Sequence, residues 1–266
     1  MDKNRLFQLK EELTHLCKDV AFFIRSQLNA VQKGDIEIKD MNSLVSYVDK
    51  EAEKKIVACL QELTPEAGYI TEEDTVKQED KDLVWIIDPL DGTTNFLNKI
   101  PHFSISIALM QNKEVVLGIV YEIMLDIAYT AIKGEGAWEN EKTISVTETN
   151  KMLDAVVVTG FPYRRDIDID ASLRVLKYCV VNCRGVRRLG SAALDLAYVA
   201  AGKIDIYYEN SLNIWDIAAG ALLVTEAGGT MKDYNGDDKF LSHGSIISSN
   251  PHLYPFIYKA ISENLT

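Results

Sequence analysis

The 266-residue sequence predicts a mixed fold of the α+β and α/β type, with helices on an antiparallel sheet in the first half and alternating helices and strands in the second. Apolar residues recur at helical spacing near the N-terminus, and runs rich in β-forming residues gather between 103 and 138. After residue 145, short apolar strands alternate with helical segments. Because no repeat or long linker separates the halves, 1–145 and 146–266, we expect one rigid body with a cleft between them.

In the first half, the periodicity predicts one helix over residues 6–28 and another over 48–63. Residues 39–49 are predicted to form the connection between them. The apolar run at 84–87 is typical of a buried strand. Since proline lacks a backbone donor, Pro89 predicts that the chain leaves the sheet after Asp88. Antiparallel strands are expected at 103–110, 115–122 and 126–132, and a turn is expected at 134–136.

In the second half, strands are predicted over residues 155–159, near 186, and over 205–208 and 245–249. Helices are predicted over residues 171–181, 192–201 and 214–227. This alternation is typical of an α/β arrangement.

Composition narrows the classes of function. The chain has 28 Lys and Arg against 40 Asp and Glu, and the formal net charge of −12 disfavours nonspecific nucleic-acid binding. There is no apolar signal segment and no run of the roughly 20 apolar residues that a bilayer span needs, so we expect a cytoplasmic protein without membrane contact. The four cysteines lack a Cys-x-x-Cys spacing, which favours reduced thiols over disulfides or a zinc site.

Asp88 and Asp91 lie three residues apart across a predicted turn directly after a strand. Their oxygens, with the carbonyl of Leu90 facing the same space, can converge on one or two hard cations. An isolated turn of this kind is equally well explained as an acidic surface loop. A phosphatase that forms an aspartyl-phosphate is expected to carry Asp-x-Asp here, but Leu90 occupies the second acidic position, so water is the expected nucleophile.

The residues that follow suit a phosphate. Gly92 lets the backbone approach a ligand closely, because glycine carries no side chain. Thr93 or Thr94 is expected to cap a short helix whose free N–H groups point at an anion.

Three acidic elements occur in order along the chain: Glu72-Glu73, Asp88-Pro89-Leu90-Asp91-Gly92-Thr93-Thr94-Asn95-Phe96 and Trp215-Asp216-Ile217-Ala218-Ala219-Gly220. They are joined by Arg188-Leu189-Gly190-Ser191-Ala192-Ala193, Tyr207-Tyr208-Glu209 and Thr225-Glu226-Ala227-Gly228-Gly229. This ordered set resembles the inositol monophosphatase family. The resemblance implies a layered α-β-α-β-α sandwich of the inositol monophosphatase and fructose-1,6-bisphosphatase type, and a magnesium-dependent, lithium-sensitive phosphomonoesterase that is usually a homodimer.

The resemblance also implies roles for individual residues. The Mg²⁺ ligands would be Glu72, Asp88, the Leu90 carbonyl, Asp91 and Asp216. Glu72 and Thr93 would orient the attacking water. The substrate contacts would be Gly92, Thr93, Thr94, Gly190, Ser191, Ala192, Glu209 and Asp216.

Each element by itself has a simpler explanation. Asp216 alone would be a helix N-terminal acid stabilised by the helix dipole, and Glu72 with Glu73 a solvated acidic loop. Arg188 is interpreted as an ion-pairing residue at a subunit or domain contact. Only the joint occurrence in order favours a metal site.

Two segments depart from the pattern of the family. Ser43 stands where members often carry Asp, which removes one acidic charge near a further magnesium site or a mobile loop. The segment 160–165 is similar to that of bacterial members and lacks a serine that can contact inositol in animal enzymes. The reaction is therefore better defined than the substrate.

The expected activity is hydrolysis of myo-inositol 1-phosphate or a similar polyol monophosphate, so the expected partner is a small phosphate ester. Relatives of the same superfamily that act on 3′-phosphoadenosine 5′-phosphate or fructose 1,6-bisphosphate are the alternative. A protein that works mainly as a binding partner in a transcription complex is the alternative from another class.

Overall fold

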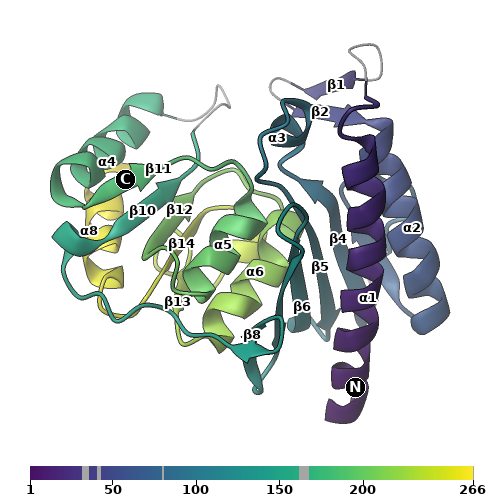
Figure 1. The fold of residues 1–266 in the computed structure, drawn as a ribbon. Helices are drawn as coiled ribbons and strands as arrows, with labels where there is room; N and C mark the ends of the chain where they lie inside the picture. The colour runs from purple at the N-terminus through teal and green to yellow at the C-terminus, as the bar shows by residue number, and fades with distance from the viewer. Residues whose placement is uncertain (32–35, 41–42, 80, 162–167, 266) are drawn as a thin grey trace.

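The computed structural model describes residues 1–31, 36–40, 43–79, 81–161 and 168–265, with 36–40, 43–45 and 265 described by their backbone alone. Five layers stack in the order helix, sheet, helix, sheet, helix (Figure 1). The predicted layered α-β-α-β-α sandwich is thereby confirmed, whereas the division of the chain at residue 145 stays a prediction. Among the described residues, no helix has both the length and the apolar character that a bilayer span requires.

The first layer contains the two predicted helices, α1 (Lys3–Gln27) and α2 (Tyr47–Leu63). Both bury one face against the first sheet because their apolar residues recur every three or four positions. α1 begins at Asp2, whose side chain accepts a hydrogen bond from Arg5 N at 2.9 Å. α2 begins with a capping box between Ser46 and Asp49.

The prediction that residues 39–49 form only a connection between two helices is wrong. The strands β1 (Ile36–Asp40) and β2 (Ser43–Ser46) pair antiparallel, and α2 begins directly after them. This ribbon lies apart from the two large sheets, beside the short helix α3 (Thr93–Leu97) (Figure 1). A two-stranded ribbon depends on tertiary support for its stability, which explains why local periodicity does not reveal it.

The second layer is a seven-stranded sheet in the order β3-β4-β5-β6-β7-β8-β9. Its strands are β3 (Gly68–Thr71), β4 (Leu83–Asp91), β5 (Ser104–Gln111), β6 (Glu114–Glu122), β7 (Ile127–Ile132), β8 (Gly136–Glu139) and β9 (Lys142–Thr143). β3 runs parallel to β4, and every later neighbouring pair is antiparallel. The predicted antiparallel sheet is confirmed.

β4 continues past Pro89, so the prediction that the chain leaves the sheet there is wrong. Asp88 pairs with Ser106 and Asp91 with Ser104, and the register shifts between them. A bulge of this kind leaves an extra residue outside the ladder, and a proline at a bulge removes no ladder hydrogen bond. The bulge places both aspartates at the end of one strand.

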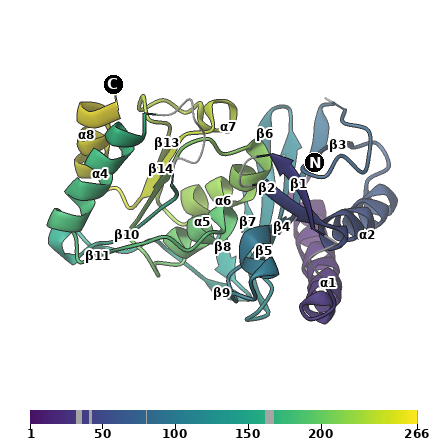
Figure 2. The ribbon, with the colours of Figure 1, turned by 90° about the horizontal axis from the view of Figure 1, so that it is seen from above.

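The middle layer contains α5 (Ala192–Ala200) and α6 (Ile214–Glu226), which are apolar on nearly all sides and lie between the two sheets (Figure 2). Two glycines permit close packing here, one between α6 and β6 and one between α6 and α5. A Cβ added at Gly118 in β6 would lie 3.0 Å from the Ala219 carbonyl oxygen, and one at Gly220 would lie 2.5 Å from Leu196 Cβ. This packing brings the start of α6 to the end of β4.

The last two layers are a five-stranded sheet in the order β11-β10-β12-β14-β13 and two outer helices. The elements are β10 (Val156–Thr159), β11 (Gly185–Arg187), β12 (Ile206–Glu209), β13 (Thr230–Lys232), β14 (Ile246–Ser249), α4 (Ile169–Asn182) and α8 (Tyr254–Leu265). The strand β13, the helix α8 and the short helix α7 (Phe240–His243) were not predicted. The predicted α/β alternation is otherwise confirmed, with β10 parallel to β11 and β12.

Candidate active site

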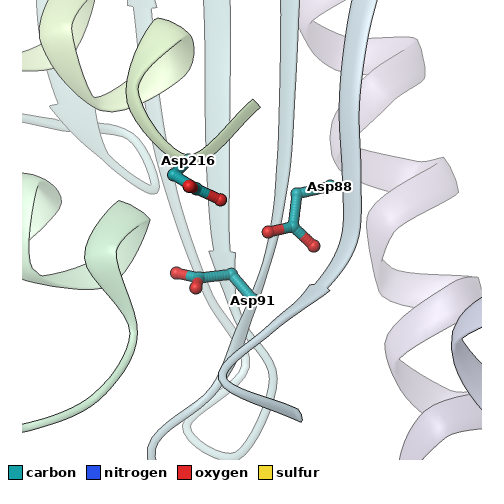
Figure 3. A group of neighbouring side chains, drawn as sticks. All are labelled: Asp88, Asp91 and Asp216. Atoms are coloured by element: carbon teal, nitrogen blue, oxygen red, sulfur yellow. The ribbon is translucent and has the colours of Figure 1, made fainter. Parts of the chain in front are cut away.

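Three aspartates meet where the first sheet faces the middle helices. Asp88 and Asp91 come from the end of β4, and Asp216 comes from the first turn of α6. One carboxylate oxygen of each lies within 4.8 Å of those of the other two. Figure 3 shows the three neighbouring side chains. We call these three residues the aspartate cluster.

Hydrogen bonds to nearby donors orient each carboxylate of the aspartate cluster. Asp88 Oδ1 accepts from Leu90 N at 2.9 Å, and Asp216 Oδ2 accepts from Asn213 N at 2.7 Å. Asp91 Oδ2 accepts from Ser191 Oγ at 2.6 Å and from the Ala193 N–H at 2.8 Å, at the start of α5.

The electrostatics of the aspartate cluster are unfavourable without a cation. Burial, followed by the negative charges of Glu72, Asp91 and Asp216, raises the pKa of Asp88 well above its usual value. Burial and the charges of Asp91 and Glu72 raise the pKa of Asp216 well above its usual value, and burial raises the pKa of Asp91. Hard oxygen donors with unneutralised charge fit Mg²⁺.

Glu72 lies beside the aspartate cluster although it comes from a different strand. It follows β3 directly, and its backbone N–H donates to the Ile87 carbonyl at 3.2 Å. Its carboxyl contacts that of Asp88 and contributes to the raised pKa of that residue. The parallel pairing of β3 with β4 therefore brings two of the predicted ligands together.

The turn after Asp91 differs in detail from the prediction. Gly92, with φ of 96°, is the N-cap of α3, so neither Thr93 nor Thr94 caps this helix. Thr93 is instead in the first turn, and its hydroxyl lies 3.0 Å from Asp49 Oδ1 and 3.1 Å from the Leu90 carbonyl oxygen. A side chain at Gly92 would crowd the neighbouring backbone, since its Cβ would lie 3.1 Å from the His102 carbonyl oxygen.

A cavity of about 160 Å³ opens beside the aspartate cluster. It is lined by Asp91, Arg188, Gly190, Ser191, Ala192, Glu209, Leu212 and Asp216. The predicted substrate contacts on the α5 side therefore share one cavity with two of the aspartates.

Glu209 forms one wall of this cavity. The Tyr207 hydroxyl donates to its Oε2 at 2.6 Å, yet burial raises the pKa of Glu209 to about 7. Gly160 packs directly against it, because a Cβ at this position would overlap the Glu209 carboxylate where it lies. Arg188 also lines the cavity, a position that the sequence did not indicate.

Sequence reasoning missed the residues that support the site. Asp49 was given no role at the site, although it accepts hydrogen bonds from the Thr93 hydroxyl and from the Ser46 N–H and hydroxyl, the last two at 2.9 and 2.7 Å. Asn95 donates from Nδ2 to the carbonyls of His102 and Leu189, both at 2.8 Å, and so connects the loop before β5 to the loop before α5. The capping-box spacing after Ser46 is a signal for Asp49.

The two segments that depart from the family pattern lie largely outside the described residues. The structure does not describe the side chain of Ser43 or any part of 162–165. Phe161 is described, follows the end of β10 by two residues, and is exposed.

Comparisons with known proteins agree with this geometry. The model of the inositol monophosphatase family matches residues 7–266. The chain is 41% identical over 237 residues to an inositol-1-monophosphatase of Mesorhizobium japonicum, covering 89% of each chain, and 38% identical over 230 residues to the Nus factor SuhB of Pasteurella multocida, covering 86% of each. The crystal structure of the extragenic suppressor protein SuhB from Bartonella henselae matches with a TM-score of 0.92 at 35% identity, covering 96% of this chain and 99% of that one.

Proposed function

Because this chain belongs to the inositol monophosphatase family, we propose that it is a magnesium-dependent phosphomonoesterase that hydrolyses myo-inositol 1-phosphate or a similar polyol monophosphate. The observation that carries the proposal is the aspartate cluster, whose three carboxylates converge within 4.8 Å beside a polar cavity. Lithium sensitivity and a homodimeric state remain part of the proposal, on the ground of family membership.

The residues present fit Mg²⁺. The proposed ligands are all oxygen donors: Glu72, Asp88, the Leu90 carbonyl, Asp91 and Asp216. When bound, Mg²⁺ supplies positive charge that neutralises the phosphoryl oxygens and lowers the pKa of water. Phosphoryl transfer depends mainly on such positioning and charge neutralisation, so the carboxylates need only hold their geometry.

Thr93 and Glu72 are the proposed groups that orient the attacking water. The Thr93 hydroxyl lies within hydrogen-bond distance of Asp49 and of the Leu90 carbonyl, and its single proton can serve only one of them at a time. Its oxygen keeps lone pairs that can accept a hydrogen bond from water. Glu72 lies against Asp88, so its carboxylate is close to the same space.

On the substrate side, the backbone N–H groups of Gly92, Thr93 and Thr94 at the start of α3 are proposed to bind phosphate oxygens. The polyol is proposed to lie in the cavity of about 160 Å³, against Gly190–Ala192. There the Glu209 carboxylate can accept hydrogen bonds from hydroxyl groups of the ester.

The test is phosphate release from myo-inositol 1-phosphate with and without Mg²⁺, with Li⁺ added, and with two other esters in parallel, 3′-phosphoadenosine 5′-phosphate and fructose 1,6-bisphosphate. Magnesium-dependent turnover that favours the inositol ester is the expected result. Preference for either of the other esters would agree with the proposed metal chemistry but would refute the inositol ester as the substrate. No turnover of any ester would refute the whole proposal.

A second candidate function is a role as a binding partner in transcription, which the name of the Pasteurella relative, Nus factor SuhB, favours. The formal net charge of −12 favours protein over RNA as the contact. Affinity capture from lysate with the Asp91→Asn variant separates the two, because this variant should lose catalysis and retain any partner surface.

A further inference from the structure

Two buried carboxylates on α2 face the segments that carry the proposed catalytic groups. Asp49 and Glu53 lie one helical turn apart, and only 1% and 0% of their respective surfaces are exposed. We call them the α2 pair. A buried carboxylate is costly unless donors surround it, so its donors indicate what it holds in place. Asp49 accepts from Thr93, whereas Glu53 faces the segment that follows β3.

Glu53 accepts four hydrogen bonds from this segment. Its Oε1 accepts from the Thr71 hydroxyl at 2.9 Å, and from the backbone N–H and the hydroxyl of Thr75 at 2.8 and 2.7 Å. Its Oε2 accepts from the Glu73 N–H at 2.8 Å. All the donors lie within residues 71–75, and Glu72 lies between two of them, Thr71 and Glu73. A carboxylate that only accepts is well matched to such a set of donors.

The opposite side of the same segment is held by β4 and by Gln78. The Glu72 N–H donates to the Ile87 carbonyl at 3.2 Å. Gln78 accepts from Thr71 N at 3.1 Å and donates to the Thr71 carbonyl at 2.9 Å. The backbone on each side of Glu72 is therefore fixed, which limits the directions in which its carboxylate can point.

We propose that Glu53 is a positioning residue for the metal site, whose carboxylate holds residues 71–75 so that Glu72 faces Asp88. The proposal rests on the proposed function, because it takes Glu72 to be a ligand of Mg²⁺. Partners that orient metal ligands without touching the metal typically change metal affinity or activity by 10- to 100-fold when they are replaced.

The Glu53→Gln variant tests this with a defined change. If the amide oxygen occupies the place of Oε1, it keeps the hydrogen bonds from Thr71 and Thr75. The amide NH₂ then faces the Glu73 N–H, so two donors oppose each other next to Glu72. Glu51→Gln is the matched control, because Glu51 is on the same helix but is exposed and paired with Lys54.

Mg²⁺ binding to the metal-free proteins is measured by titration calorimetry, together with the Mg²⁺ concentration for half-maximal activity and the midpoint of thermal unfolding in a chelator. We expect Glu53→Gln to weaken Mg²⁺ binding about tenfold or more and to shift the activity curve equally, with Glu51→Gln unchanged. Unchanged Mg²⁺ affinity with a lower unfolding midpoint would overturn the proposal, because Glu53 would then have a purely structural role.

If Glu53→Gln does not fold, Thr75→Val and Thr75→Ser provide the same test, since valine removes one hydroxyl donor to Glu53 and serine keeps it. Weaker Mg²⁺ binding in the valine variant alone supports the proposal, and equal binding in both overturns it. Failure of the proposed function is distinguishable. Mg²⁺ binding by the wild type without hydrolysis would refute that function and leave the test of Glu53 intact, whereas no Mg²⁺ binding would refute both.

Discussion

The aspartate cluster and the α2 pair are both groups of poorly exposed carboxylates, but their surroundings differ. In the aspartate cluster, the charges of neighbouring acids add to burial and raise the pKa of Asp88 and Asp216 further. In the α2 pair, burial raises the pKa of Asp49, but hydrogen bonds from Ser46 and Thr93 oppose this shift. Glu53 accepts four hydrogen bonds from three residues.

The difference in surroundings indicates two different functions for buried carboxylates. Carboxylates that face donors are satisfied by the protein and can hold its loops in place. Carboxylates that face each other need a cation, so their arrangement costs stability in the metal-free protein. Thr93 links the two groups, because its hydroxyl contacts Asp49 and the carbonyl of Leu90, which lies between Asp88 and Asp91 in the chain.

The largest expected effect is that of Asp91→Asn. The amide oxygen can still accept from Ser191 and Ala193, but one negative charge is lost from the aspartate cluster. Turnover should fall by at least about 10³-fold, on the scale of removing a group that stabilises transition-state charge, while the metal-free protein stays folded. Steady-state kinetics and thermal unfolding in a chelator measure this, and activity near that of the wild type would refute the metal assignment.

Thr93→Val tests the link between the two groups. The variant loses the hydroxyl that contacts Asp49 and the Leu90 carbonyl but keeps the shape of the side chain. We expect kcat to fall about 100-fold, the lower range for loss of a group that positions a proton transfer, with KM little changed. A change in KM alone would show that Thr93 binds substrate without orienting water.

Glu209→Gln is expected to act on substrate binding with less effect on the chemical step. Glu209 lies in the cavity outside the aspartate cluster, and its pKa is raised to about 7 by burial. Loss of its charge should raise KM for the polyol ester about tenfold, the scale of a hydrogen bond to a charged group. The wild-type KM should fall as pH rises through about 7, because the ionised form accepts hydroxyl donors, and the variant should lack this dependence.

The smallest expected effect is on the stability of the metal-free protein. A group with a raised pKa in the folded state contributes stability below its unfolded pKa, near 4 for Asp, and this is lost as pH rises through the folded value. The unfolding midpoint in a chelator should therefore fall as pH rises above about 4, by roughly 2–4 °C for each kcal/mol. Mg²⁺ should reduce this decrease, and Asp91→Asn should make it shallower. If the unfolding midpoint falls equally with pH in the metal-free wild type, the Mg²⁺-bound wild type and Asp91→Asn, the aspartate cluster is not the origin of the pH dependence.

The N-terminal helices and the β-rich runs were predictable from the sequence because their apolar residues have clear periods and bury one face. α8 was missed although Leu253, Ile257 and Ile261 recur at helical spacing, and Pro255 near its start is compatible with a first helical turn. β13 has three residues, too few for a period to be detected.

At the candidate site, too, some features could be predicted from the sequence and others could not. The sequence by itself determined which acids are predicted as metal ligands, because Asp88 and Asp91 lie in one short motif and Glu72 and Asp216 occur in order around it. Only the tertiary structure decided that β4 continues through a bulge at Pro89 and that the start of α6 packs against its end. The tertiary structure also gave Glu53 its place beneath the segment that carries Glu72. The physical reason is that hydrogen-bond partners distant in sequence are chosen by the packing of layers, which local residue patterns do not encode.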